Sequence, residues 1–113
     1  EKLNEVLEAT KVGGATLTKM LGTSAWYAPG AAVSSLVHSI VCDQHKLFPC
    51  SVFLEGEYGL SDLCIGVPVL LGANGIEKIV EIDLDSSEKE KLATSAQGVR
   101  KTNDLLIEIG ALS

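Results

Sequence analysis

The spacing of apolar residues changes twice along the chain, from a helical period to a strand period and back again. In the first third, apolar positions recur every three or four residues, as on an α-helix with one apolar face. Three such stripes are present, at positions 3, 6 and 7 with Thr10 on the same face, at 17, 20 and 21, and at 33, 36, 37, 40 and 41. Each glycine in a helix costs about 1 kcal/mol relative to alanine. We therefore expect a first helix to end at Gly13-Gly14 and a short second helix to end near Gly22.

The third helix has two possible starting points within "GTSAWYAPGAAV", residues 22–33. Ser24 is a favourable N-cap, and Pro29 fits a first turn because it has no N–H to leave unpaired. A start at Ser24 requires a kink at Pro29, whereas a later start near Pro29 does not. Either start leaves backbone N–H groups just before Ala31 partly unpaired, and therefore available to water or a ligand.

After Phe48-Pro49 the pattern becomes that of strands. Residues 50–57 ("CSVFLEGE") are rich in strand formers, 63–72 ("LCIGVPVLLG") are mostly apolar, and 76–84 ("IEKIVEIDL") alternate loosely. Asn74-Gly75 predicts an antiparallel hairpin with a turn of the primed type, in which both residues have positive φ. Because Pro68 cannot donate to a neighbouring strand, we expect an edge or a bulge at that point.

Residues 85–109 predict a long final helix, with Ser87 as N-cap and Glu90 completing a capping box. Its predicted inward face consists of Leu92, Ala96, Val99, Asn103 and Leu106. Helices, then strands, then a helix indicate one α+β domain over residues 1–113, with packed helices and an antiparallel sheet.

Composition narrows the class of protein. The 113 residues are 46% hydrophobic and 21% charged, which is too apolar for a disordered chain. A net charge of −6 without a basic cluster disfavours nucleic-acid and anionic-membrane partners, and no apolar run reaches the ~20 residues that cross a bilayer. No signal peptide is evident. Since the chain begins at Glu1 inside a helical pattern, we expect it to be part of a longer protein.

The three cysteines, Cys42, Cys50 and Cys64, are odd in number and form no CxxC pair. They favour buried free thiols in a reducing compartment over a disulfide framework or a zinc site, so we expect a cytoplasmic location.

No self-sufficient active site can be found from residue types and spacing. His38 and His45 are predicted on the exposed side of the third helix as surface imidazoles, and neither an i, i+4 partner nor a third metal ligand is evident. Glu55 and Glu57 are predicted to belong to a turn rather than to a catalytic pair. The glycines of "GANG" lead into a strand, whereas a dinucleotide cradle requires a helix there. We therefore predict no catalytic residue and no metal site in this chain.

Several motifs nevertheless resemble one family. "SAWYAPGAAV" is similar to the Ser-Ala-Tyr-Tyr-Ala-Pro-Ala-Ala segment of the lactate/malate dehydrogenase family, in its bacterial, lactate-dehydrogenase-like malate branch. Residues 48–84 resemble the family's Leu-Pro-Cys strand, Glu-Gly-Glu-Tyr-Gly loop, Gly-Val-Pro strand and final hairpin, and the match runs in one register from about residue 1 to 107. Trp26 and Gly30 depart from the family's Tyr and Ala.

The resemblance implies the C-terminal, substrate-side domain of an NAD-dependent enzyme that transfers a hydride between malate and NAD to give oxaloacetate. The family's Rossmann domain, which binds most of the NAD, and its catalytic His, Asp and substrate-binding arginines come earlier and are absent here. The chain alone is therefore expected to be inactive. By the resemblance, Ser24 and Ala25 form a wall of the substrate pocket, and Pro29 lies near the nicotinamide end of the cofactor.

Two alternatives stay open, namely the same domain of an L-lactate dehydrogenase and a domain that only binds or assembles. In the family, the choice between malate and lactate depends chiefly on a mobile-loop residue upstream. Within this chain it would rest on residues 27–29 and 65–68, and malate is favoured. The family also implies a homodimer or homotetramer, with neither nucleic acid nor membrane as partner.

Overall fold

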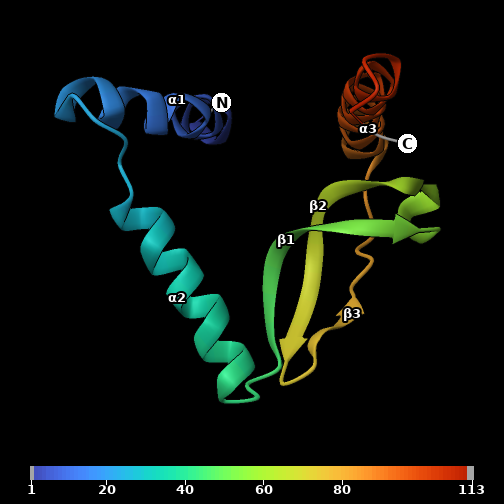
Figure 1. Ribbon diagram of the computed structural model, residues 1–113, viewed down its shortest axis with the longest axis horizontal. Coiled ribbons are helices and arrows are strands. Elements are labelled where there is room, and N and C mark those ends of the chain that lie inside the picture. The colour runs from blue at the N-terminus through green and yellow to red at the C-terminus, as the bar shows by residue number, and fades with distance from the viewer. Residues whose placement is uncertain (1, 112–113) are drawn as a thin grey trace. The chain divides into compact units, whose positions relative to one another are not determined.

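The computed structural model describes residues 2–111 (Figure 1), and along the chain helices precede and follow an antiparallel sheet. In chain order, the elements are α1 (Lys2–Leu21), α2 (Tyr27–Val41), β1 (Lys46–Glu55), the 3-10 helix η1 (Glu57–Gly59), β2 (Ser61–Gly72), β3 (Gly75–Ile79) and α3 (Ser86–Glu108). The chain divides into two compact units within α2, one ending at His38 and the other beginning at Ser39. The predicted α+β class with an antiparallel sheet is confirmed.

In the first unit, α1 is one continuous helix of 20 residues that passes through Gly13 and Gly14. The predicted break at this glycine pair is wrong, because two glycines weaken a helix without forcing a turn. The helix ends instead at Gly22, which has a left-handed φ of +70° and donates its N–H to the Thr18 carbonyl at 3.0 Å. None of the described residues of α1 is buried.

Helix α2 begins at Tyr27, where the first hydrogen bond of the helix joins the Gly30 N–H to the Trp26 carbonyl at 2.8 Å. Pro29 therefore lies in the first turn and Ser24 lies outside the helix, which matches the later of the two predicted starts. The predicted buried stripe is wrong for Val33, Val37 and Val41, whose exposed fractions are 57%, 52% and 77%.

In the second unit, the sheet has the order β1-β2-β3 with antiparallel pairing throughout. β1 begins earlier than predicted, so Pro49 lies inside it, directly opposite Pro68 of β2. Two opposed residues without N–H groups must occupy a pair that exchanges no hydrogen bonds. The carbonyl of Pro68 instead accepts the Val80 N–H at 2.8 Å. β2 is the central strand, but its pairing with β3 stops at Val69, so at Pro68 it pairs with β1 alone, which agrees with the expected edge at that point.

The hairpin between β2 and β3 is confirmed, but its turn differs from the predicted one. Gly72 pairs with Gly75 across Ala73-Asn74, and only Gly75 of the two predicted turn residues has positive φ, at +88°. A type I′ turn needs positive φ at both central residues and a type II′ turn at the first, but neither Ala73 nor Asn74 has positive φ, so the turn is of another type. The pairing register shifts between Leu70 and Leu71, so the irregularity of β2 lies there and not at Pro68.

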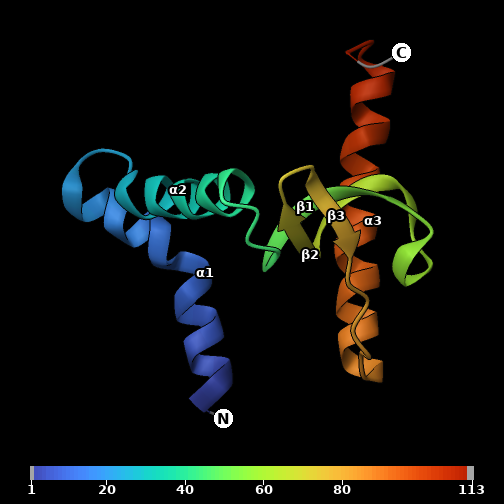
Figure 2. The same ribbon diagram turned by 90° about the horizontal axis from the view of Figure 1, so that it is seen from below.

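The core of the second unit lies on one face of β1 and β2, where alternate residues are buried. These are Val52, Leu54, Leu63, Ile65, Val67, Val69 and Leu71, together with Ala96 of α3. α3 packs against β2 (Figure 2). The five positions predicted for its inward face are its buried and half-buried ones, so that prediction is confirmed.

The first turn of α3 is capped two residues earlier than predicted. Asp85 Oδ1 accepts the Glu88 N–H at 2.8 Å, and the Asp85 N–H donates to Glu88 Oε2 at 2.9 Å. Asp85 and Glu88 therefore form the capping box in place of Ser87 and Glu90, since both pairs have the spacing that the motif requires. Within residues 2–111, none of the helices combines the length and apolar character needed to cross a bilayer.

Candidate functional site

The predicted pocket-wall residues lie in the segment that joins α1 to α2. Ser24 is exposed, Ala25 is half-buried, and Pro29 is exposed in the first turn of α2. Trp26 and Tyr27 lie between Ala25 and Pro29 in the sequence, and their ring centroids are 6.2 Å apart with planes tilted by 41°. Ser24, Ala25 and Pro29 are thus brought into one short, accessible segment.

The backbone of this segment presents hydrogen-bond donors. Because the helical hydrogen bonds begin at the Gly30 N–H, the N–H groups of Tyr27 and Ala28 precede them, and Pro29 has no N–H. The side chains of Ser24, Ala25 and Pro29 do not gain or lose a charge near neutral pH. The segment can therefore donate hydrogen bonds and shape a surface, but it offers no acid or base.

The strand residues considered for substrate choice divide between the two faces of β2. Ile65 and Val67 are buried in the core of the second unit, with exposed fractions of 6% and 3%. Gly66 is exposed and Pro68 half-buried on the opposite face. Only Gly66 and Pro68 are therefore available to contact another molecule.

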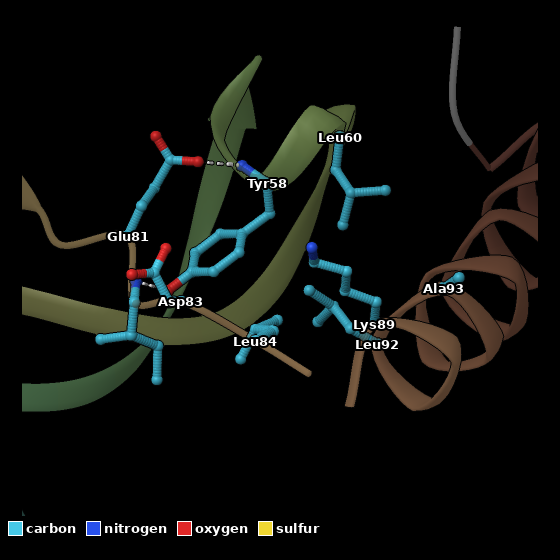
Figure 3. A pocket seen from close by; sticks show the side chains of 9 residues that line it. Tyr58, Leu60, Glu81, Asp83, Leu84, Lys89, Leu92 and Ala93 are labelled. Carbon is cyan, nitrogen blue, oxygen red and sulfur yellow. Dashed lines mark hydrogen bonds between the residues drawn. The ribbon is translucent and has the colours of Figure 1, made fainter. Parts of the chain in front are cut away.

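A cavity of about 490 Å³ lies beside Tyr58 in the second unit (Figure 3). It is lined by Tyr58, Leu60, Glu81, Ile82, Asp83, Leu84, Lys89, Leu92 and Ala93. The Tyr58 N–H donates to Glu81 Oε2 at 2.6 Å, while its hydroxyl donates to the Val80 carbonyl at 2.9 Å and accepts the Ile82 N–H at 3.1 Å. Sequence reasoning missed this cavity, because its walls come from segments far apart in the chain.

The turn that carries Tyr58 is stabilised by a carboxylate. Glu57 Oε2 accepts the Glu55 N–H at 2.9 Å, and this bond is the largest cause of a Glu57 pKa below 4.5. The N–H groups of Glu57 and Gly56 lower the pKa further, against a small opposing effect of burial. The predicted turn role of Glu55 and Glu57 is consistent with this contact.

The prediction that His45 lies on a helix is wrong. It lies in the loop between α2 and β1, where its φ is +48°. Its imidazole lies between two carboxylates, with Nε2 3.2 Å from Asp43 Oδ1 and Nδ1 2.7 Å from Glu77 Oε2. His38 is exposed on α2, as predicted. Sequence spacing did not indicate the carboxylate of Glu77 as a neighbour of His45, because the sequence does not show that β3 lies beside this loop.

The prediction of buried cysteines is wrong, because none of the three is buried. Cys42 and Cys64 are exposed and Cys50 is half-buried, and the thiols of Cys50 and Cys64 are free. Cys64 lies between the buried residues Leu63 and Ile65 in β2, so the alternation of the strand places it on the opposite face.

Comparison with known proteins places this arrangement in a family. The family model for the lactate/malate dehydrogenase alpha/beta C-terminal domain matches residues 1–108. The malate dehydrogenase of Bacteroides thetaiotaomicron is 70% identical over 112 residues, which cover 99% of this chain and 36% of that protein. That of Flavobacterium johnsoniae is 59% identical, with 95% and 34% covered.

Solved structures agree with the sequence relatives. The malate dehydrogenase of Salinibacter ruber superposes with a TM-score of 0.90 at 46% identity, covering 96% of this chain and 37% of that chain. The lactate dehydrogenase of Eimeria maxima, solved with NADH and oxamate, gives 0.91 at 34% identity, with 96% and 34% covered. The chain spans about a third of the length of these relatives. It belongs to the lactate/malate dehydrogenase family, as a C-terminal domain of that family.

Proposed function

We propose that this chain is the substrate-side domain of an NAD-dependent malate dehydrogenase, which interconverts malate and oxaloacetate. The observation that carries the proposal is the 70% identity to a malate dehydrogenase across 99% of the chain. The lactate dehydrogenase of Eimeria maxima reaches a similar TM-score at only 34% identity. The shared fold thus suits both substrates, and the sequence favours malate.

In this proposal, Ser24, Ala25 and Pro29 form one wall of the pocket. The methyl group of Ala25 and the ring of Pro29 limit the space for the reactants and exclude water, and the Ser24 hydroxyl offers a hydrogen bond to a substrate oxygen. The exposure of Ser24 just before α2 and of Pro29 in its first turn fits a wall open to a ligand. NAD supplies the hydride acceptor, and Pro29 would contact only its nicotinamide end.

The proposal assigns the proton acceptor and most of the NAD site to residues outside this chain. Oxidation of an alcohol carbon releases a hydride to the cofactor and a proton to a base. His38 and His45 do not belong to the Ser24–Pro29 segment, and the hairpin glycines Gly72 and Gly75 lead into a strand. We therefore expect the 113-residue chain alone to show no turnover.

The proposal also includes the oligomeric state and the cellular location of the full-length protein. The apolar side chains of Leu3, Val6 and Leu7 on α1 are 72%, 61% and 49% exposed, which suits a helix that another domain or subunit covers. A homodimer or homotetramer is proposed, to be checked by light scattering. The free thiols of Cys50 and Cys64 favour the reducing cytoplasm.

The test is an NADH absorbance assay of the full-length protein with malate, with lactate and without substrate. We expect NAD reduction with malate well above that with lactate. Equal rates with the two acids would support the lactate dehydrogenase alternative. Absence of a rate with any 2-hydroxy acid would favour a domain that only binds or assembles.

A further inference from the structure

We propose that His45 and Glu77 bind a divalent transition-metal ion of the Zn²⁺ class, with Asp43 orienting the imidazole. The three side chains come from the loop between α2 and β1 and from β3, and one ligand atom from each lies within 4.8 Å of the others. Imidazole nitrogen and carboxylate oxygen are both ligands that such ions accept. This site is independent of the proposed dehydrogenase function.

The geometry around the imidazole assigns different roles to its two nitrogens. Nδ1 lies 2.7 Å from Glu77 Oε2, and two ligands bound at about 2.1 Å in the tetrahedral geometry of Zn²⁺ lie roughly 3.4 Å apart, so a small rotation of the Glu77 side chain would bring both to one ion. Nε2 lies 3.2 Å from Asp43 Oδ1. A metal-binding histidine commonly donates its other ring N–H to a carboxylate, which fixes the tautomer and the ring plane. Nδ1 and Glu77 are therefore the ligand pair, and Asp43 is the positioning residue.

The surrounding backbone holds these side chains together. Asp43 Oδ1 accepts the Ala73 N–H at 2.8 Å, so the orienting carboxylate is itself fixed to the β2–β3 turn. A Cβ atom at Gly72 would lie 2.3 Å from Glu77 Oε1 and 2.9 Å from Asp43 Oδ1. Only glycine at position 72 leaves room for both carboxylates where they now lie.

The local charge also favours a cation. Among the ion pairs within residues 2–111, Asp43 and Glu77 pair with His45 and neither pairs with a lysine or arginine. The cluster holds two carboxylates, those of Asp43 and Glu77. An ion at Nδ1 would balance them, and water would complete its coordination because His45 is 49% exposed.

The test uses untagged full-length protein, stripped with a chelator and titrated with ZnCl₂ by calorimetry at one fixed, slightly alkaline pH, because metal binding competes with protons for the ligands. His45→Asn removes the ligand while keeping a residue that tolerates positive φ. We expect His45→Asn and Glu77→Gln to abolish one Zn²⁺ site per chain. Asp43→Asn, which keeps the acceptor for Ala73, should weaken that site by about tenfold. His38→Asn is the matched control and should leave it unchanged.

Co²⁺ absorption and thermal unfolding complete the test. Co²⁺ bound to imidazole and carboxylate gives weak visible bands without thiolate charge transfer, and these bands should vanish in His45→Asn. Zn²⁺ should raise the unfolding temperature of the parent protein but not of Glu77→Gln, each compared with its own chelator-treated sample. Equal Zn²⁺ binding by parent and His45→Asn, no binding at millimolar Zn²⁺, or a thiolate spectrum insensitive to position 45 would overturn the proposal.

Discussion

The hydroxyl of Tyr58 donates a hydrogen bond to the carbonyl of Val80 at 2.9 Å, joining the turn after β1 to the segment after β3. The same oxygen accepts the Ile82 N–H, so one side chain satisfies two backbone groups. Tyr58 reaches this position with a left-handed φ of 55°, between Gly56 and Gly59, which also have positive φ. This connection forms one end of the cavity shown in Figure 3.

Tyr58→Phe is expected to destabilise the protein by about 1 kcal/mol, since it removes both hydrogen bonds of the hydroxyl and leaves the partner groups to water. The measurement is the free energy of unfolding in urea. Tyr27→Phe is the matched control, because Tyr27 is 81% exposed, and it should change stability little. Equal losses in the two variants would show that the Tyr58 contacts contribute nothing.

Asp85→Ala is expected to cost about 1 kcal/mol of unfolding free energy through loss of the helix cap. Asp85→Asn should cost less, because its amide oxygen can still accept the Glu88 N–H. Ser87→Ala tests the alternative cap position and should be close to neutral. A larger loss in Ser87→Ala than in Asp85→Ala would show that the helix starts at the later position.

Gly14→Ala is expected to stabilise the protein by up to about 1 kcal/mol, because Gly14 lies inside a continuous helix with no atom within 4 Å of an added Cβ. Gly75→Ala should do the opposite, since its φ of +88° is unfavourable for a side chain. Circular dichroism during thermal unfolding can compare the two. Destabilisation by Gly14→Ala would indicate a turn at the glycine pair.

The pKa of Glu57 gives a pH dependence with a defined sign. A carboxyl group whose pKa is lower in the folded state contributes stability that is complete above the unfolded pKa, near 4.5, and is lost as pH falls through the lower folded value. Below about pH 4.5, the parent should therefore lose stability more steeply than Glu57→Gln, which no longer titrates. Glu5→Gln removes a charge elsewhere and serves as control. Parallel curves for parent and Glu57→Gln would contradict the effect.

Ala25→Leu in the full-length protein is expected to lower kcat/KM for malate by at least about tenfold, because the larger side chain would occupy the proposed pocket. Pro29→Ala should instead raise KM for NAD with little change in KM for malate. Steady-state kinetics with each substrate varied separately would distinguish the effects. Unchanged constants in both variants would remove this segment from the site.

The sequence predicted those parts of the fold that depend on local periodicity. Five spaced residues of α3 identified its inward face, and Asn74-Gly75 identified the hairpin. The prediction of the exact cap failed because Asp85-x-x-Glu88 and Ser87-x-x-Glu90 satisfy the same spacing rule, and only the hydrogen bonds of the folded chain distinguish them. The predicted end of the first helix at Gly13-Gly14 was wrong because glycine lowers the stability of a helix without necessarily ending it.

For the candidate sites too, only groups of residues close together in the chain could be predicted from the sequence. Ser24, Ala25 and Pro29 are neighbours in the chain, so a motif could group them before any fold was known. The contacts of His45 with Glu77 and of Tyr58 with Val80 join residues far apart in the sequence. Such contacts depend on strand pairing and loop path, which periodicity does not reveal.

The opposed prolines Pro49 and Pro68 have a consequence for how the sheet assembles. If β1 and β2 slipped by one residue, one of the two prolines would enter a hydrogen-bonding position and leave a carbonyl on the other strand without its donor. The same slip would turn the apolar residues of one strand toward solvent. A slip by one residue therefore costs free energy in two independent ways, and the proline pair favours the native register during folding.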